Sequence, residues 1–109
     1  MKPADYNYLD DAKAAFVESA IQRVAESGRM AYQFTLSAND IKNGMKRERL
    51  REETIDGIVD YFRQEGIDAE HDAVRDRFRV TVDLHNVAMS PAEAQFLSAA
   101  MGKFRVEHT

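Results

Sequence analysis

Hydrophobic residues near the start of the chain recur at intervals of three and four positions, which is the pattern of an amphipathic helix. This periodicity predicts a helix over residues 7–27, with Asp5 or Asn7 as its N-cap. Gly28 follows the last periodic residue and can adopt the left-handed conformation that often ends a helix. The predicted apolar face consists of Leu9, Ala12, Phe16, Ala20, Ile21 and Val24.

The pattern changes to strict alternation over residues 30–36, which predicts a half-buried strand. Its apolar face would carry Met30, Tyr32, Phe34 and Leu36. Ser37 and Asp40 then resemble a capping box, with Asp in place of the usual Glu. They predict a short helix that ends at Gly44.

A third helix is predicted over residues 46–65, where apolar residues again fall on one face and Gly66 provides the stop. Gly57 lies inside this helix, and an interior glycine costs about 1 kcal/mol relative to alanine. A close approach by another backbone is the expected compensation for that cost.

Two further alternating segments, residues 67–72 and 77–84, are separated by a polar turn and predict a hairpin. Ser90, Pro91 and Glu93 then form a strong helix start, with serine as the cap and proline at the first helical position. The apolar edge of this last helix, which contains Leu97, Met101 and Phe104, could pack on the sheet or form a homodimer contact.

The predicted order is therefore α-β-α-α-β-β-α, in one α+β domain over residues 1–109. A hairpin is antiparallel, and each predicted strand has one apolar face. The expected fold is a small antiparallel sheet of about three strands covered by helices on one side.

Composition narrows the class of protein. The chain has 109 residues, no cysteine and a net charge of -4. The absence of cysteine excludes a disulfide framework, thiol catalysis and a zinc–thiolate site. No apolar run near the N-terminus suits a signal peptide, and none is long enough to span a bilayer. We therefore expect a cytoplasmic protein that does not associate with membranes.

The segment 46–51 is a basic island in this acidic chain. Because the element order resembles that of a winged helix, the predicted 46–65 helix could be a recognition helix and the 73–79 hairpin tip a wing. The candidate DNA-binding residues are Lys46, Arg47, Arg49, Arg75 and Arg77. However, residues 44–53 carry four basic and three acidic side chains, so the same segment also fits an ordinary solvated surface.

Acidic residues dominate the second half of the chain, where residues 55–109 carry ten Asp/Glu and six Lys/Arg. Spacing places two of these acids on one helix face and three on one strand face. Such a face could bind a basic protein, or it could serve solubility alone. The candidate protein-binding residues are Asp56, Asp60, Asp68, Glu70 and Asp72.

The sequence gives little reason to expect an enzyme. The chain contains no Gly-rich phosphate loop, nucleophile elbow or HExxH motif. His71 and Asp72 are adjacent on a predicted strand, so their side chains point to opposite faces and do not converge on a metal. We expect no catalytic residue, metal or cofactor. The favoured function is protein–protein interaction by an accessory or inhibitory protein, and the alternative is DNA binding.

Overall fold

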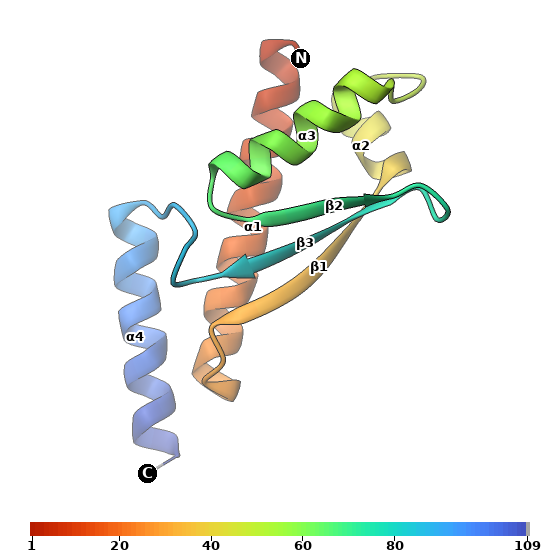
Figure 1. The fold of residues 1–109 in the computed structure, drawn as a ribbon. Helices are drawn as coiled ribbons and strands as arrows, with labels where there is room; N and C mark the ends of the chain where they lie inside the picture. Colours follow the sequence, from red (N-terminus) through yellow and green to blue (C-terminus); the bar gives the residue numbers. More distant parts are fainter. Residues whose placement is uncertain (109) are drawn as a thin grey trace.

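The computed structural model describes residues 1–108, which form four helices and one three-stranded antiparallel sheet (Figure 1). The order α-β-α-α-β-β-α and the α+β class are those predicted from the sequence. The elements are α1 (Pro3–Ser27), β1 (Ala31–Ser37), α2 (Ala38–Met45), α3 (Glu52–Gln64), β2 (Asp68–Asp72), β3 (Arg77–Asp83) and α4 (Pro91–Glu107).

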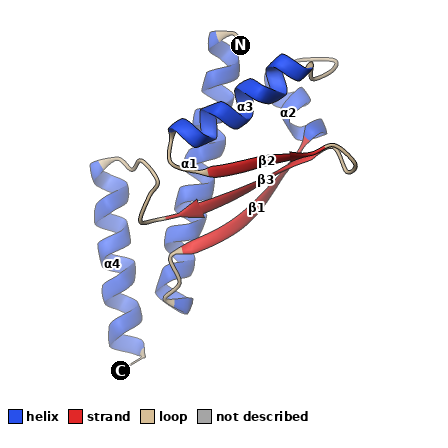
Figure 2. Ribbon diagram, in the orientation of Figure 1, coloured by secondary structure: helices blue, strands red, loops and turns tan. Residues whose placement is uncertain are grey.

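The sheet has the order β1-β3-β2, so β3 is central and pairs antiparallel with both neighbours. In this register Val80 lies between Phe34 of β1 and Ala69 of β2, all on the inner face. Burial alternates along β3, where Phe78, Val80 and Val82 are buried. The outer face is polar, and α1 passes behind the sheet in Figure 2.

The hydrophobic core lies between this inner face and the apolar sides of α1, α2 and α3. Its largest fully buried side chains include Leu9, Ile41, Ile58, Phe62 and Phe78. Leu9 is one of the periodic positions predicted for the apolar face of the first helix, and Leu36 of the predicted strand is buried as well, because burial selects one face of each helix and strand. Within residues 1–108, no helix is long and apolar enough to cross a membrane.

The start of α1 differs from the prediction. The helix begins at Pro3, which occupies its first turn, and neither Asp5 nor Asn7 is the N-cap. Asp5 instead lies in the first turn, where its carboxylate accepts a 2.8 Å hydrogen bond from the backbone amide of Lys2. This bond satisfies a backbone amide at the helix start. The helix can therefore begin at Pro3, four residues before the start at residue 7 that the apolar periodicity predicted.

The predicted cap of α2 is confirmed, because the Ser37 hydroxyl accepts a 3.1 Å hydrogen bond from the Asp40 amide. The predicted stop at Gly44 is wrong. The helix continues to Met45, and Lys46 takes the left-handed conformation with φ of 55°. Gly44 is instead covered by the ring of Tyr8, which a Cβ atom at this position would overlap.

The predicted 46–65 helix is wrong at its start, since α3 begins only at Glu52. Residues 46–51 connect the two helices without regular structure. The backbone at Lys46 has already turned into the left-handed region, which a right-handed helix cannot contain. The three atoms nearest to a Cβ added at Gly57 all belong to the Met1 side chain, the first at 3.4 Å, so the expected close approach of another backbone does not occur at this glycine within residues 1–108.

The close backbone approach occurs at Gly66, where an added Cβ would meet the carbonyl group of Asn86. In α4 the predicted capping box is confirmed, with the Glu93 carboxylate accepting from the Ser90 amide at 2.8 Å. This helix runs beside α1 in Figure 1, and the Phe104 ring packs over Gly28. The apolar edge of α4 is therefore used mainly against α1.

Candidate binding groove between α3 and β2

A groove with a volume of about 560 Å³ lies between α3 and the edge strand β2. The helix contributes three carboxylates on one face, because Glu52, Asp56 and Asp60 are spaced four residues apart. The strand contributes Glu70. The full lining is Glu52, Ile55, Asp56, Val59, Asp60, Arg63, Glu70 and His71.

Apolar side chains form part of this groove. Ile55 and Val59 are half-buried, pack against the hydrophobic core and also line the groove. They are one helical turn apart on α3, beside the row of carboxylates. The groove therefore combines aliphatic surface with an acidic rim, which is the composition that binds an amphipathic segment.

Negative charge dominates the groove. Within residues 1–108, Glu52, Asp56 and Asp60 form no ion pair, whereas Glu70 pairs with Arg79 at 2.5 Å. Arg63 contributes a guanidinium group to the groove lining, and its Nη2 atom donates a hydrogen bond to the backbone carbonyl of Ala69 at 3.2 Å. An incoming cation would therefore meet carboxylates that have no partner in the described chain.

Three of the five predicted protein-binding residues meet in this groove, namely Asp56, Asp60 and Glu70. Asp68 lies on the same strand face as Glu70 and is exposed. Asp72 is used in the hairpin turn, where its Oδ1 accepts from the amides of Val74 and Arg75 at 3.1 and 3.2 Å. The amide of Arg75, followed by that of Val74, lowers the pKa of Asp72 from its ordinary value.

The candidate DNA-binding residues are not on one helix. Lys46, Arg47 and Arg49 lie in the irregular segment before α3. The Nη2 atom of Arg47 donates to the buried carboxylate of Asp5 at 2.7 Å, so this guanidinium serves the fold.

The hairpin arginines lie at the other end of α2. The Ala38 amide, at the start of α2, donates to the carbonyl of Asp76 in the hairpin turn at 3.1 Å. The basic segment follows the end of this 8-residue helix, which is about 12 Å long at 1.5 Å per residue. Arg75 is 3.8 Å from Asp72, and Arg77 begins β3 opposite the same residue. The two basic groups therefore lie at opposite ends of α2, and their joint binding of DNA stays a prediction.

Sequence reasoning missed the other residues of the groove, which are Glu52, Ile55, Val59, Arg63 and His71. Two of these groups could have been predicted from the sequence. Glu52, Asp56 and Asp60 recur every four residues, and so do Ile55 and Val59, which places each set on one side of a helix. The proximity of α3 to β2 has no signal in local spacing, because it depends on how the chain turns at Gly66.

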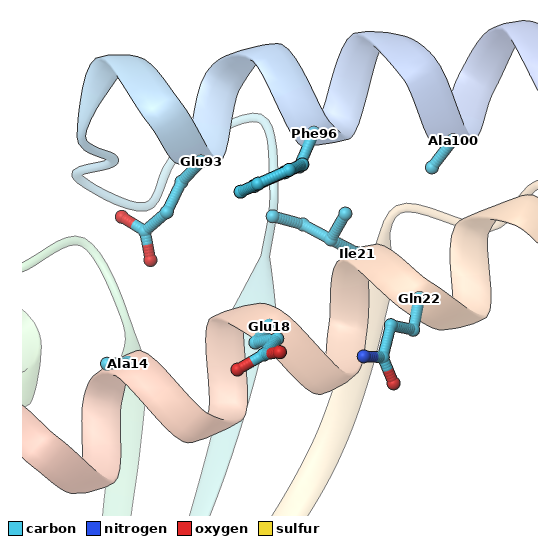
Figure 3. Close-up of a pocket in the computed structure, with 7 residues that line it drawn as sticks. All are labelled: Ala14, Glu18, Ile21, Gln22, Glu93, Phe96 and Ala100. Carbon is cyan, nitrogen blue, oxygen red and sulfur yellow. The ribbon is translucent and has the colours of Figure 1, made fainter.

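A second groove, of about 490 Å³, lies between α1 and α4 (Figure 3). Phe96 and Ile21 lie between the two helices in this view, with Glu18 and Glu93 nearby. Phe96 is 67% exposed, which is unusual for a ring beside a core. The Glu93 carboxylate already caps α4, so this groove offers fewer unpartnered charges than the α3–β2 groove.

Among residues 1–108, no three His, Cys, Asp or Glu side chains are grouped closely enough to hold a metal ion. His71 is instead in contact with the Phe78 ring at a centroid distance of 4.8 Å and with Asp76 at 3.3 Å. Comparisons with protein-family models, curated proteins and solved structures found no match to this chain.

Proposed function

We propose that this chain is a non-catalytic accessory or inhibitory protein that binds a basic segment of another protein in the α3–β2 groove. The observation that carries the proposal is that Asp56 and Asp60 of α3 line one groove together with Glu70, a residue of the β2 edge. Glu70 is ten positions from Asp60 and fourteen from Asp56 in the sequence, so it is the fold that places the three residues at one groove. The half-buried Ile55 and Val59 add apolar surface at the same place.

Electrostatics and burial would act together in such a complex. Unpartnered carboxylates attract lysine and arginine side chains over a Debye length of about 8 Å at physiological salt, which accelerates encounter. Burial of Ile55 and Val59 would then slow dissociation, because apolar area removed from water contributes about 25 cal/mol per Å². The charges would select the partner, and the aliphatic side chains would hold it.

A selection from a display library of random peptides, each about 12 residues long so that it can span one groove, tests this proposal. We expect enrichment of peptides rich in Lys and Arg. Their binding should fall by roughly tenfold or more in the double variant Asp56→Lys with Asp60→Lys, because two attractions become repulsions. Their affinity should also decrease as salt is raised.

The matched control is the double variant Asp11→Lys with Glu26→Lys. Both residues are exposed on α1, outside the lining of the α3–β2 groove, and the change in net charge is the same. This control should retain binding. Enriched peptides without a basic excess, or equal losses in both double variants, would show that the groove is not the binding site.

A further inference from the structure

We infer that the segment bound in the α3–β2 groove lies extended along β2 and adds a fourth strand to the sheet, with basic and apolar residues alternating. This inference rests on the proposed function and specifies the form and pattern of the partner. It follows from the free edge of β2, the outer-face charges of the strands and the aliphatic side chains of α3.

The edge of β2 has outward-facing backbone groups. Within residues 1–108, β2 pairs only with β3, and every second residue of an antiparallel edge strand directs its N–H and C=O away from its neighbour. The Ala69 carbonyl accepts from Arg63 of α3, so it faces the groove. Ala69 and His71 are therefore the residues that present their backbone to the groove, whereas Glu70 pairs with β3.

Arg63 occupies the place of an incoming donor. Its guanidinium satisfies the Ala69 carbonyl from the side on which an added strand would lie. The Arg63 side chain is exposed, so it can leave this carbonyl for solvent without disturbing the core. An added strand would supply a backbone N–H in its place, as in other cases where a peptide extends a sheet edge.

The outer face of the sheet determines which side chains the added strand should carry on that face. On β3, Arg77 and Arg79 stand opposite Asp72 and Glu70 of β2, so neighbouring strands alternate in charge. Asp68 shares this outer face and is exposed. A new strand on the far side of β2 would stabilise these acids best with lysine or arginine, because opposite charges in adjacent strands attract.

The inner face of the sheet determines the remaining side chains of the added strand. Side chains of the added strand that lie beside Ala69 and His71 would point toward α3, on the same side as the half-buried Ile55 and Val59. Apolar residues fit these positions, and the exposed Asp56 and Asp60 at the rim of the groove attract the basic residues of the strand through their charge, without direct contact. β2 is 5 residues long, so the bound stretch has about the same length, roughly 17 Å.

A blocked peptide of alternating Lys and Val, about seven residues long, is the defined probe, because this length suffices for one strand. We expect it to bind the wild-type protein and to protect the amides of Ala69 and His71 from hydrogen exchange. Binding should fall by roughly tenfold or more in the Asp56→Lys and Asp60→Lys double variant, because two attractive charges at the rim of the groove become repulsive, and it should be retained in the Asp11→Lys and Glu26→Lys control.

Backbone methylation distinguishes strand addition from docking by side chains alone. One peptide carries N-methyl groups on its valines and a second carries them on its lysines. Because alternate amides of a strand face opposite edges, one of the two should lose roughly tenfold or more in affinity and the other should bind almost normally.

Equal binding of both methylated peptides would overturn strand addition while leaving the groove as the site, provided that the Asp56→Lys and Asp60→Lys variant still weakens binding. Failure of the unmethylated peptide to bind would also overturn the inferred pattern. Binding that ignores the double variant would instead contradict the proposed function, because the site would then lie elsewhere.

Discussion

Asp5 is buried at the first turn of α1, with only 1% of its surface exposed. Its carboxylate accepts from the amide of Lys2 and from the guanidinium of Arg47. The hydrogen bond from Arg47 is the main reason that the pKa of Asp5 lies below its ordinary value of 3.8. This ion pair fixes the irregular segment before α3 to the start of the chain.

The substitution Asp5→Asn should lower the free energy of unfolding at pH 7 by about 2–3 kcal/mol, because it removes the charge that satisfies a partly buried guanidinium. The folded-state pKa is depressed, so this stabilisation is present above pH 3.8 and is lost as the pH falls through the lower folded-state value. Urea unfolding at pH 7, 5 and 3 measures both effects.

The difference between wild type and Asp5→Asn should therefore shrink between pH 5 and pH 3. Asp11→Asn is the control, because Asp11 is exposed on the same helix and forms no ion pair within residues 1–108. A difference that stays constant over this pH range would contradict the assigned role of the Asp5 carboxylate.

Local patterns in the sequence predicted the caps of α2 and α4 because Ser37 and Ser90 bond to amides three residues away. They did not predict the partner of Arg47, because Asp5 is separated from it by 42 positions. Arg47 was a candidate DNA-binding residue because of its charge and because the element order resembles that of a winged helix. Charge is visible in a sequence, whereas the distant carboxylate that neutralises it becomes known only from the fold.

At the scale of the element, three helical glycines have different surroundings. A Cβ added to Gly102 in α4 would meet no atom of residues 1–108 within 4 Å, whereas a Cβ on Gly44 in α2 would overlap the Tyr8 ring. Tyr8 is partly buried, and desolvation, followed by the charge of Asp40, raises its pKa. Gly57 in α3 is intermediate, with Met1 at 3.4 Å.

We expect Gly102→Ala to stabilise the protein by up to about 1 kcal/mol, because alanine restricts the unfolded chain and favours helix. Gly44→Ala should destabilise it by about 1–3 kcal/mol, since overpacking against the Tyr8 ring exceeds the gain in helix propensity. Thermal unfolding of the two variants measures the contrast. Stabilisation by Gly44→Ala would show that Tyr8 can move away at little cost.

Element types were predictable, and element boundaries were not always so. The alternation in β1 and β3 and the three- and four-residue spacing in α1 each reflect burial of one face. The segment 46–51 contains good helix formers, yet its first residue is left-handed and Arg47 is bound to Asp5. Tertiary contacts therefore override local helix propensity in this segment.

At the scale of the whole molecule, the candidate groove was predictable only as two separate halves. Spacing placed Asp56 with Asp60, and alternation placed Glu70 with Asp68 and Asp72. The sheet order β1-β3-β2 makes β2 an edge, and the turn at Gly66 brings this edge beside α3. Neither the edge position of β2 nor its proximity to α3 follows from a local sequence pattern. The sequence alone therefore did not show that the acidic residues of α3 and of β2 belong to one groove.

We expect α4 to be a separate unit of stability. This helix packs along α1 through the buried Leu97 and Ala100, while Phe96 remains largely exposed. The preceding loop is attached to the rest of the chain by the Ala88 amide, which donates to the Glu65 carbonyl at 2.9 Å. Because β3 is central in the sheet and α4 is peripheral, α4 can open while the sheet stays folded.

Native-state hydrogen exchange should therefore give the amides of α4 a lower opening free energy than those of β3. The substitution Phe104→Ala removes the ring that packs over Gly28. It should lower the opening free energy of the α4 amides by about 1–2 kcal/mol without changing that of the β3 amides. Phe96→Ala is the matched control in the same helix, because its ring is 67% exposed and its loss should change the α4 value by less than about 0.5 kcal/mol. If Phe104→Ala lowers the α4 and β3 values equally, then α4 unfolds only with the whole molecule and its packing on α1 is part of the global core.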